Sequence, residues 1–489
     1  MNADLPDRVV LGIDLGTQGL RVLAVDPQGR ILASAQSRIP LANVTLPEGW
    51  SEQDPRDWWR ETCICTQQII DRLPHGTVVD GLAVDSTSGT VLPVDAAGSP
   101  LHPAIMYNDN RSQAFVTIVR EKAAALENRL GYSFGSSFAL PKIFWLMQER
   151  QDIFAQTAWF IHAADYLNLK LAGGAPLSDF SNALKTGYDL IEDRWPDFIE
   201  DELGIPIARL PRVVPPGTQI GRVTKEAAYA AGLPFGTSIF SGATDGTAAQ
   251  IASGALDPGA WNSSLGTTLV VKGISRELVL DPQRRIYSHR HPEGMWMPGG
   301  ASNTGSEWIL NEYPDADLKQ LDQQAASILP TPLIRYPLTR QGERFPFISP
   351  TASGFTEGIG SSKVELYAAG LEGLALLEKL CYETLSTIGI PVGDRIFTTG
   401  GGSKSMVWTE LRASVLNRQM MRMEVEETAM GAALLAARGA WYGSLAKAAH
   451  HMVRAKQVID PIPGWQPLLD EKYERFILLL KQKGFLNRE

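Results

Sequence analysis

The sequence has little cysteine, no excess of positive charge and no long apolar run, and each shortage excludes a class of protein. Three cysteines in 489 residues cannot build a disulfide framework, and the spacing of Cys63 and Cys65 does not match a zinc or redox pair. The formal net charge of −9 argues against a protein that binds nucleic acid or an anionic membrane surface. Because the sequence shows no stretch of about 18 apolar residues and no signal-peptide pattern, we expect a cytoplasmic protein that does not act at a membrane.

The remaining composition is that of an ordinary globular chain, with 44% hydrophobic and 20% charged residues. Apolar alternation predicts three strands at Val9–Ile13, Leu20–Val25 and Ile31–Ala35, the first two joined by the glycine turn Leu15–Gly19. A second Leu-Gly-Thr hairpin follows at Leu265–Thr267. Strands alternate with helices around both hairpins, which predicts an α/β fold made of two related halves.

We place the boundary between the halves after residue 254, so that residues 1–254 form one domain and residues 255–489 the other. From Leu468 onward the sequence has the pattern of an amphipathic helix, which needs a surface to dock on. The first domain is the expected surface.

A carboxylate beside a glycine turn is the first candidate site. Asp14 ends the first predicted strand, and Gly16, Thr17 and Gln18 follow it. Glycine lets backbone N–H groups approach an anion closely, Thr17 can donate to a phosphoryl oxygen, and Asp14 can hold Mg²⁺. The alternative is a hairpin turn in which the aspartate caps its own backbone.

A second carboxylate, Asp245, lies in the turn Ser241–Thr247, directly before a segment of small residues that is predicted to be helical. An aspartate at this place is either the N-cap of the helix or a catalytic base, because a helix N-terminus also faces incoming anions. Both interpretations remain open from the sequence.

Gly400, Gly401 and Gly402 join a predicted strand, Asp394–Thr399, to a predicted helix. Three consecutive glycines cost backbone entropy, which indicates either a nucleotide lying against the backbone or close packing of the helix and the strand. The segment does not have the spacing of a Walker A loop.

Two other patterns are set aside. Gly131–Gly135 has the spelling of a nucleophile elbow, but it follows a helical pattern where the elbow needs a strand. The pairs His289 with His291 and His450 with His451 lack the spacing of a metal site.

Eight motifs together resemble the FGGY carbohydrate kinase family over nearly the whole chain. In order, they are DLGTQGLR, GWSEQDPRDWW, PAIMYNDNRS, SGATDGTAAQIASGA, SLGTT, GLEGLALL, TTGGGSKSMVW and EETAMGAALLA. The resemblance implies two actin-like (ribonuclease-H-like) ATPase domains with a catalytic cleft between them. It also implies ATP and Mg²⁺ as cofactors and a small-molecule sugar as partner, and we expect a monomer or a homodimer.

Matched residue by residue, the resemblance implies that Asp245 is the general base and that Asp14 holds Mg²⁺, directly or through water, near the transferred phosphate. The implied phosphate-binding residues are Gly16, Thr17, Gln18, Arg21, Gly266 and Thr267. The implied sugar-binding residues are Ser88, Asn108, Asp109 and Arg111, together with Asp245. The implied nucleotide-binding residues are Gly300, Gly400, Gly401, Gly402, Ser405 and Trp408, with the Trp408 ring offering a flat face to the adenine.

This sequence departs from the family pattern at two places. Gln18 and Gly19 stand where hydroxyl residues usually follow Gly-Thr, which puts side-chain contacts to the γ-phosphate in question. Ser405 stands where close relatives have Asn, so one side-chain contact to the nucleotide is weakened.

The substrate is predicted from finer similarities. VDSTSGTVLPVD and SNALKTGY are most similar to the cyanobacterial and plant sugar kinases that act on D-ribulose, and bacterial xylulose kinases carry Met-His where Ser88 and Gly89 stand. GWSEQDPRDWW, however, is similar to xylulose kinases. We therefore predict phosphorylation of the C5 hydroxyl of a ketopentose, D-ribulose first and D-xylulose as the alternative, ahead of another ketose or polyol. Alternatives from other classes are an actin-like ATPase without a sugar substrate and a sugar-binding protein that has lost catalysis.

Overall fold

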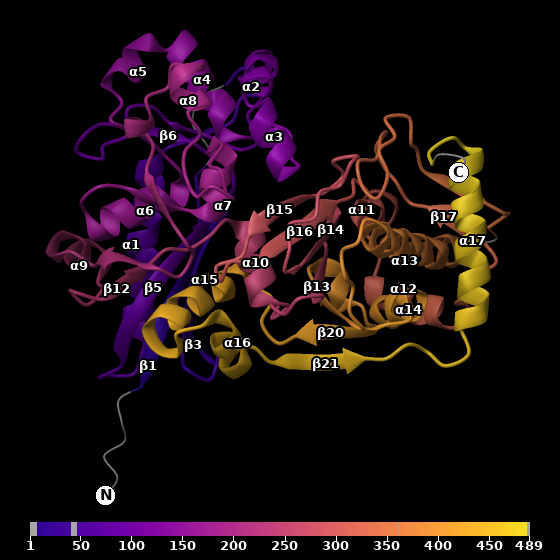
Figure 1. Cartoon of the computed structure of the whole chain (residues 1–489). Helices are drawn as coiled ribbons and strands as arrows, with labels where there is room; N and C mark the ends of the chain where they lie inside the picture. The colour runs from indigo at the N-terminus through magenta and orange to yellow at the C-terminus, as the bar shows by residue number, and fades with distance from the viewer. Residues whose placement is uncertain (1–6, 41–45, 361, 487–489) are drawn as a thin grey trace, which may run out of the picture. The chain divides into compact units, whose positions relative to one another are not determined.

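The computed structural model describes residues 7–40, 46–360 and 362–486, and its elements are labelled in Figure 1. The chain forms two compact units. Unit 1 comprises residues 1–254, 289–294 and 427–453, and unit 2 comprises residues 255–288, 295–426 and 454–489. The chain first passes from unit 1 to unit 2 after Gly254, where the sequence placed the boundary. Residues 427–453, which were expected in the second domain, belong to unit 1.

Unit 1 is built on a six-stranded sheet with the order β11-β12-β5-β1-β2-β3. Its strands are β1 (Arg8–Leu15), β2 (Gly19–Val25), β3 (Ile31–Arg38), β5 (Val78–Ser86), β11 (Gln219–Arg222) and β12 (Ser238–Phe240). Strands β1 to β3 form an antiparallel meander, while β1, β5 and β12 run parallel to one another. The carboxyl ends of these three parallel strands therefore lie at one edge of the sheet.

Short paired strands and helices complete unit 1. The strand pairs are β4 (Glu52–Gln53) with β7 (Ala104–Ile105), β6 (Leu92–Val94) with β8 (Trp159–Ile161), and β9 (Leu177–Asp179) with β10 (Arg212–Val214). The helices are α1 (Pro55–Arg72), α2 (Val116–Lys122), α3 (Ala124–Leu130), α4 (Ala139–Glu149), α5 (Gln151–Gln156), α6 (Ala163–Ala172), α7 (Phe180–Ala183), α8 (Phe198–Asp201), α9 (Lys225–Ala231), α10 (Asp245–Ala252), α15 (Thr428–Ala437) and α16 (Leu445–Met452).

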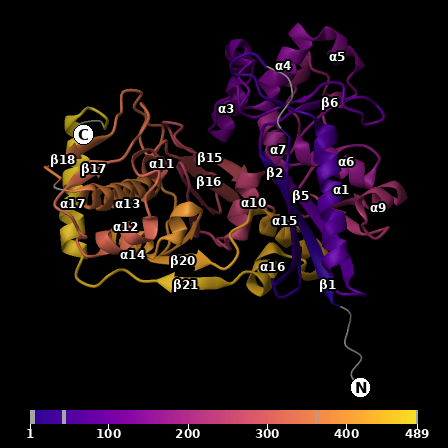
Figure 2. The ribbon, with the colours of Figure 1, turned by 180° about the vertical axis from the view of Figure 1, so that it is seen from behind.

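Helices cover both faces of the first sheet. Helix α1 packs on β2 and β3 and contacts α6 and α9, whereas α15 packs on β1 and β5 and contacts α10 (Figure 2). Because β1 is flanked by two strands and covered on both faces, its residues form a nearly continuous buried run, Val9–Ile13. This buried sheet is the rigid support of the elements described below.

Unit 2 repeats this topology in a seven-stranded sheet with the order β15-β16-β14-β13-β19-β20-β21. Its strands are β13 (Trp261–Leu265), β14 (Leu269–Gly273), β15 (Tyr287–Arg290), β16 (Trp296–Ala301), β19 (Arg395–Thr399), β20 (Gln419–Met423) and β21 (Ala455–Ile459). Strands β13, β14 and β16 form the antiparallel meander, and β19 and β20 run parallel to β13. The two Leu-Gly-Thr hairpins thus occupy the same place in two sheets of the same design, as the sequence predicted.

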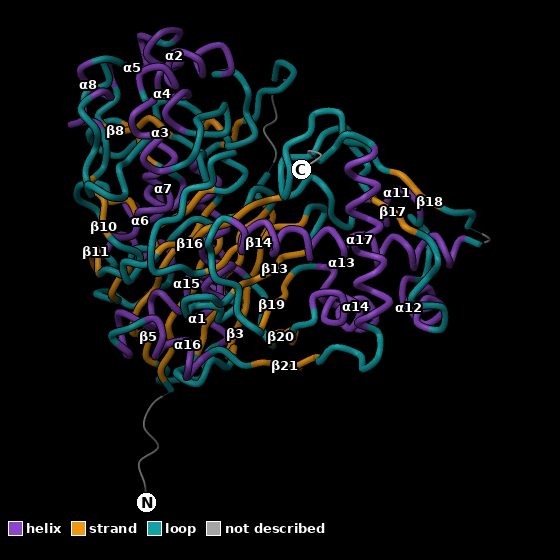
Figure 3. The backbone as a smooth tube through the Cα atoms, turned by 45° about the vertical axis from the view of Figure 1, so that its right-hand side comes forward, coloured by secondary structure: helices purple, strands orange, loops and turns teal. Residues whose placement is uncertain are grey.

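The remaining elements of unit 2 are β17 (Ile334–Tyr336) paired with β18 (Phe355–Glu357), and the helices α11 (Glu307–Glu312), α12 (Leu318–Ala326), α13 (Lys363–Thr387), α14 (Met406–Leu416) and α17 (Gln466–Gln482). The C-terminal helix α17 contributes Leu469, Tyr473 and Phe476 to the core of unit 2 and lies beside α13 and α14 (Figure 3). The expectation that it docks on the first domain is wrong, because the chain has already returned to unit 2 through β21.

Candidate active site

Three parallel strands of unit 1 each lead to an aspartate at the same edge of the sheet. Asp14 and Asp85 are register partners near the ends of β1 and β5. Asp245 opens α10 after the loop that leaves β12, and a bridge between Ser86 and Thr244 ties that loop to the end of β5. The negative charges of Asp14 and Asp245 both act on Asp85. Residues far apart in the sequence therefore form one cluster of carboxyl groups.

Asp14 and Asp85 are hydrogen-bonded to each other through their carboxyl groups. Burial raises the pKa of Asp14, and the bond to Asp85 and the charge of Arg21 oppose that rise. Burial also raises the pKa of Asp85 well above its ordinary value, and the neighbouring charges of Asp14 and Asp245 raise it further. The pair therefore favours either a proton or a cation between its carboxyl groups.

The donors at this edge fit a magnesium ion. Both oxygens of Asp85 are buried and, apart from the Asp14 carboxyl group, have no hydrogen-bond partner among the described residues, and Asp14 is partly exposed. Among residues 7–40, 46–360 and 362–486, no group of three or more His, Cys, Asp and Glu side chains could hold a metal. Magnesium needs only one or two carboxylates, because it keeps several waters and takes phosphate oxygens. Asp14 and Asp85 are the carboxylates that would hold it.

The glycine turn after β1 is held in one conformation by backbone contacts. The Gly16 N–H donates to the Gly19 carbonyl at 2.9 Å, and the Gln53 amide donates to the Thr17 carbonyl at 2.6 Å. Thr17 is half-buried and Gln18 is exposed. The turn therefore presents its tip at the same edge as Asp14.

Arg21, which was expected to bind phosphate, is already engaged. Its guanidinium donates to Gln36 at 2.8 Å and to the carboxylate of Glu427 at 3.2 Å. Its side chain is 40% exposed. Arg21 lies opposite Asp14 in the register of β1 and β2, so its charge acts on the site through Asp14 rather than as a free cation.

Asp245 is the first residue of α10, and Thr244 occupies the N-cap position. The Asp245 carboxylate accepts the N–H of Gly246 at 2.6 Å and is half-buried. It is therefore not the N-cap, and it lies at the helix N-terminus, where a catalytic base is expected.

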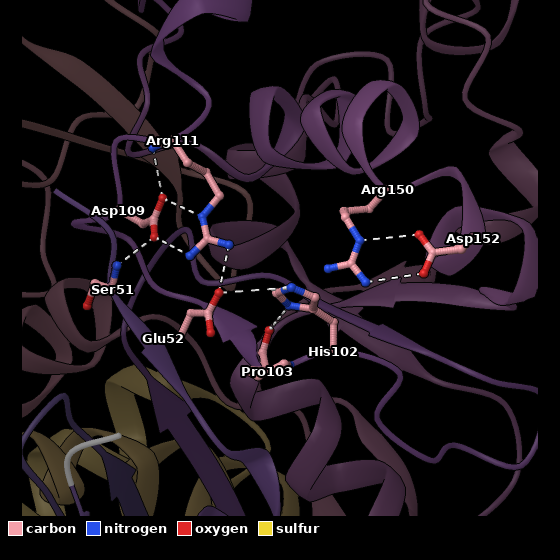
Figure 4. Close-up of polar contacts among 8 residues, drawn as sticks. All are labelled: Ser51, Glu52, His102, Pro103, Asp109, Arg111, Arg150 and Asp152. Carbon is pink, nitrogen blue, oxygen red and sulfur yellow. Dashed lines mark hydrogen bonds and ion pairs between the residues drawn. The ribbon is translucent and has the colours of Figure 1, made fainter. Parts of the chain in front are cut away.

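Arg111 and Asp109, expected to bind the sugar, instead bind each other (Figure 4). The Arg111 Nε and Nη2 atoms donate to Asp109 at 2.9 and 2.7 Å, and Nη1 lies 2.7 Å from Glu52. The guanidinium also stacks 3.8 Å from the ring centroid of Trp50. Both side chains of the Arg111–Asp109 pair are fully buried. The two residues hold the loop together; the buried Nη1 atom of Arg111 forms an ion pair with Glu52 but has no hydrogen-bond partner among the described residues. A structural role is therefore shown for this pair, and its sugar-binding role stays a prediction.

The other two expected sugar-binding residues are better placed. Asn108 is exposed. The Ser88 hydroxyl is buried and has no hydrogen-bond partner among the described residues, so it is available to a ligand hydroxyl. The turn at Ser88–Gly89 is fixed by Lys142, whose Nζ donates to the Gly89 carbonyl at 3.1 Å.

In unit 2, the second hairpin connects β13 and β14. The Gly266 N–H donates to the Thr268 carbonyl at 3.0 Å, and the Ser306 hydroxyl and N–H both donate to the Gly266 carbonyl. Thr267 is exposed. This turn has the form that the sequence predicted for a phosphate-binding hairpin.

The triple glycine lies against the second hairpin of the same unit. Gly400 has a φ of +89°, and a Cβ there would lie 2.6 Å from the Leu265 carbonyl oxygen; a Cβ on Gly402 would lie 2.4 Å from the Leu265 side chain. No described atom would lie within 4 Å of a Cβ on Gly401. Close packing therefore explains Gly400 and Gly402, whereas Gly401 faces open space and can meet a ligand.

Two expected nucleotide-binding residues belong to the core instead. Trp408 is 2% exposed, and its ring N–H donates to the Leu371 carbonyl at 3.0 Å, so it offers no open face to an adenine. Gly300 packs on the Phe345 ring, which a Cβ would approach to 2.8 Å. Ser405 is the N-cap of α14, its hydroxyl accepting the Trp408 N–H at 3.1 Å.

Sequence reasoning missed two carboxylates at these sites. Asp85 ends a buried strand in the same way as Asp14, with an apolar residue before it, and that repeated pattern could have identified it. Glu426 accepts the Gly400 N–H at 3.2 Å and the Ser403 hydroxyl at 2.9 Å. No local signal indicated Glu426, because its contacts depend on the fold.

The sequence matches a known family of proteins over both halves of the chain. The N-terminal domain of the FGGY family of carbohydrate kinases matches residues 9–252, and the C-terminal domain matches residues 261–440. The xylulose kinase of Staphylococcus epidermidis is 26% identical over 493 residues, 97% of each chain. The ribulokinase of Geobacillus thermodenitrificans is 25% identical over 537 residues, 96% of this chain and 94% of that protein.

Among solved structures, the xylulose kinase from Rhodospirillum rubrum is 27% identical and superposes with a TM-score of 0.88, covering 97% of this chain and 99% of that one. These matches confirm the predicted fold of two actin-like domains. Within the described part of the chain, no helix combines the length and the apolar character needed to cross a bilayer.

Proposed function

Because the chain belongs to the FGGY family of carbohydrate kinases, we propose that it transfers the γ-phosphate of ATP to a terminal hydroxyl group of a ketopentose. The observation that carries the proposal is the cluster of Asp14, Asp85 and Asp245 at the carboxyl edge of one sheet, beside a glycine hairpin. Such a site supplies a base, a place for a cation and backbone donors for phosphate, which are what phosphoryl transfer needs.

Asp245 is the general base in this mechanism. Its half-buried carboxylate takes the proton of the sugar hydroxyl while the hydroxyl oxygen bonds to the γ-phosphorus. The bond between the γ-phosphorus and its bridging oxygen breaks, and the electron pair leaves with ADP. Asp245 lies in the first turn of α10, where the helix dipole favours negative charge.

Asp14 and Asp85 would hold Mg²⁺, which when bound neutralises charge on the triphosphate. The Gly16 N–H closes the turn by donating to the Gly19 carbonyl, and the backbone N–H groups at the tip of the turn are the ones that would bind phosphoryl oxygens. Backbone donors can serve where Gln18 and Gly19 replace the usual hydroxyl residues.

Unit 2 supplies the nucleotide-binding elements. Gly266 and Thr267 form the second hairpin, and Gly401 and Ser405 lie in the loop that begins α14. The open space at Gly401 supports a nucleotide lying against this backbone. Glu426 holds the loop in place through Gly400 and Ser403.

D-xylulose is our first candidate substrate, because the relatives named above include xylulose kinases that match nearly the whole chain. This reverses the order that the sequence motifs suggested. D-ribulose is the second candidate, favoured by the Ser88–Gly89 pair and by the ribulokinase relative. The unpartnered Ser88 hydroxyl is available to a hydroxyl group of either ketose.

The test is an ADP-release assay with Mg²⁺-ATP and D-xylulose, D-ribulose, L-ribulose, L-xylulose, ribitol, xylitol and glycerol. We expect turnover that requires a ketopentose. The Asp245→Asn variant should lower kcat by about 10²–10⁴-fold, the usual contribution of a general base, while Asp152→Asn, at an exposed aspartate, should not. ADP release that is equal with and without sugar would instead identify an ATPase, and full turnover by Asp245→Asn would remove the base from the mechanism.

A further inference from the structure

A chain of buried hydrogen bonds leads from β9 to the residue that precedes Asp245. The Thr244 N–H donates to the Ser181 hydroxyl oxygen at 2.8 Å. The Ser181 hydroxyl in turn donates to the Asp179 carboxylate at 2.5 Å. Ser181, Asp179 and Thr244 are 0%, 3% and 1% exposed, so solvent does not compete for these bonds.

The direction of each bond in this chain is fixed. Asp179 also accepts the backbone N–H groups of Ser181 and Asn182 at 2.7 and 3.1 Å and the Asn182 side-chain amide at 2.6 Å, which caps the short helix α7. With four donors on its carboxylate, Asp179 cannot turn away from Ser181. The Ser181 proton points to Asp179, and its lone pair is left facing the Thr244 N–H.

The loop that carries Asp245 is fixed by β5 on its other side. A Cβ on Gly242 would lie 1.8 Å from the Val84 carbonyl oxygen, and the Ser86 N–H donates to the Ala243 carbonyl at 3.2 Å. Thr244 is therefore the last residue held by β5, and the Thr244 N-cap has no side-chain capping bond of its own. Ser181 supplies the contact that sets where α10 begins.

We propose that Ser181, oriented by Asp179, is a positioning residue for the Asp245 carboxylate. The inference rests on the proposed function, in which Asp245 is the base. A shift of about 1 Å in a reacting group can cost roughly a hundredfold in rate. The buried Ser181 hydroxyl on α7, which accepts the Thr244 N–H before α10, therefore controls turnover without touching substrate.

The test compares Ser181→Ala with Ser253→Ala in the full chain, using D-xylulose and Mg²⁺-ATP as probes. Ser253 is a matched control, because its buried hydroxyl donates to the Gln250 carbonyl at 2.7 Å at the other end of α10. We expect Ser181→Ala to lower kcat by about ten- to a hundredfold with the KM for ATP unchanged. Ser181→Thr, which keeps the hydroxyl, should restore most of kcat, and Ser253→Ala should leave kcat within about twofold of the parent. If D-xylulose is not turned over, the ketopentose identified by the assay above replaces it.

A double-mutant cycle separates positioning from general damage. In the Asp245→Asn background, Ser181→Ala should change kcat by less than about twofold, because no base is left to position. Equal kcat losses in both backgrounds, or equal kcat values for Ser181→Ala and Ser253→Ala, would overturn the proposal. If Ser181→Ala does not fold, Ser181→Cys carries the same test, since the thiol keeps the bulk and is a weak acceptor. Failure of Asp245→Asn to lower kcat would count against the proposed base, independently of Ser181.

Discussion

At the scale of single residues, Arg111 stabilises the fold beside the site through its ion pairs. It neutralises Asp109 and Glu52 and is stacked on Trp50. We expect Arg111→Ala to lower the free energy of unfolding by about 3–5 kcal/mol, because it leaves the buried Asp109 carboxylate without its cationic partner. Urea unfolding measures this loss.

The control for Arg111 is Arg150→Ala, because the Arg150–Asp152 ion pair is exposed and its loss should change stability little (Figure 4). A variant Arg111→Ala that keeps its unfolding free energy but raises the KM for sugar would return Arg111 to the sugar-binding residues.

The lowered pKa of His162 predicts that the free energy of unfolding depends on pH. Burial lowers the pKa of His162 to about 4, although its bond to the Thr90 carbonyl opposes the shift. The unfolded chain, with an ordinary histidine pKa of about 6.5, therefore takes up the proton first. Stability from this group is complete above pH 6.5 and falls by about 3 kcal/mol as the pH drops to 4.

The His162→Gln variant tests this assignment, since it keeps polar groups and removes the titrating ring. Urea unfolding at several pH values should give a smaller loss of stability between pH 6.5 and 4 than in the parent chain. Parallel curves for the two proteins would show that another group is responsible.

At the scale of elements, the triple glycine combines packing and binding in adjacent residues. Gly400→Ala places a Cβ in a left-handed backbone conformation and against the Leu265 carbonyl, a strain of about 1–3 kcal/mol. We expect it to lower the melting temperature and raise the KM for ATP. Gly401→Ala meets no described atom within 4 Å, so it should raise the KM for ATP at unchanged melting temperature. A Gly401→Ala variant with unchanged KM would place the nucleotide elsewhere.

The same element shows what the sequence could and could not predict. Turns and strand ends are local: the glycines at 16, 266 and 400 and the strands before them follow from apolar alternation and turn chemistry. The resemblance implied that Trp408 offers its ring to the adenine, but the ring is buried, and Leu371, far away in the sequence, accepts its N–H. The place of Asp85 beside Asp14 and the pairing of Arg111 with Asp109 also could not be predicted from local sequence. Burial and pairing are set by distant partners.

At the scale of the whole molecule, the chain returns to unit 1 for residues 427–453 and then to unit 2. Consecutive residues at this crossing serve different units: Glu426 holds the Gly400 loop, and Glu427 pairs with Arg21 beside Asp14. The sequence did not predict the crossing, because the buried helix α15 carries no polar face that would indicate which sheet it covers. Each unit nonetheless carries its own set of the proposed ligand-binding elements.

That division predicts where each ligand protects the backbone from hydrogen exchange. ADP alone should slow exchange at residues 265–268 and 400–405, because these loops of unit 2 carry the proposed nucleotide contacts. The ketopentose alone should slow exchange at residues 86–90 and 243–246 of unit 1. Asp245→Asn should keep the ADP pattern, since it removes a proton acceptor in unit 1 and none of the proposed nucleotide contacts. If ADP slowed exchange only in unit 1, the hairpin of unit 1 would be the one that binds the nucleotide. The triple glycine would then have no part in nucleotide binding.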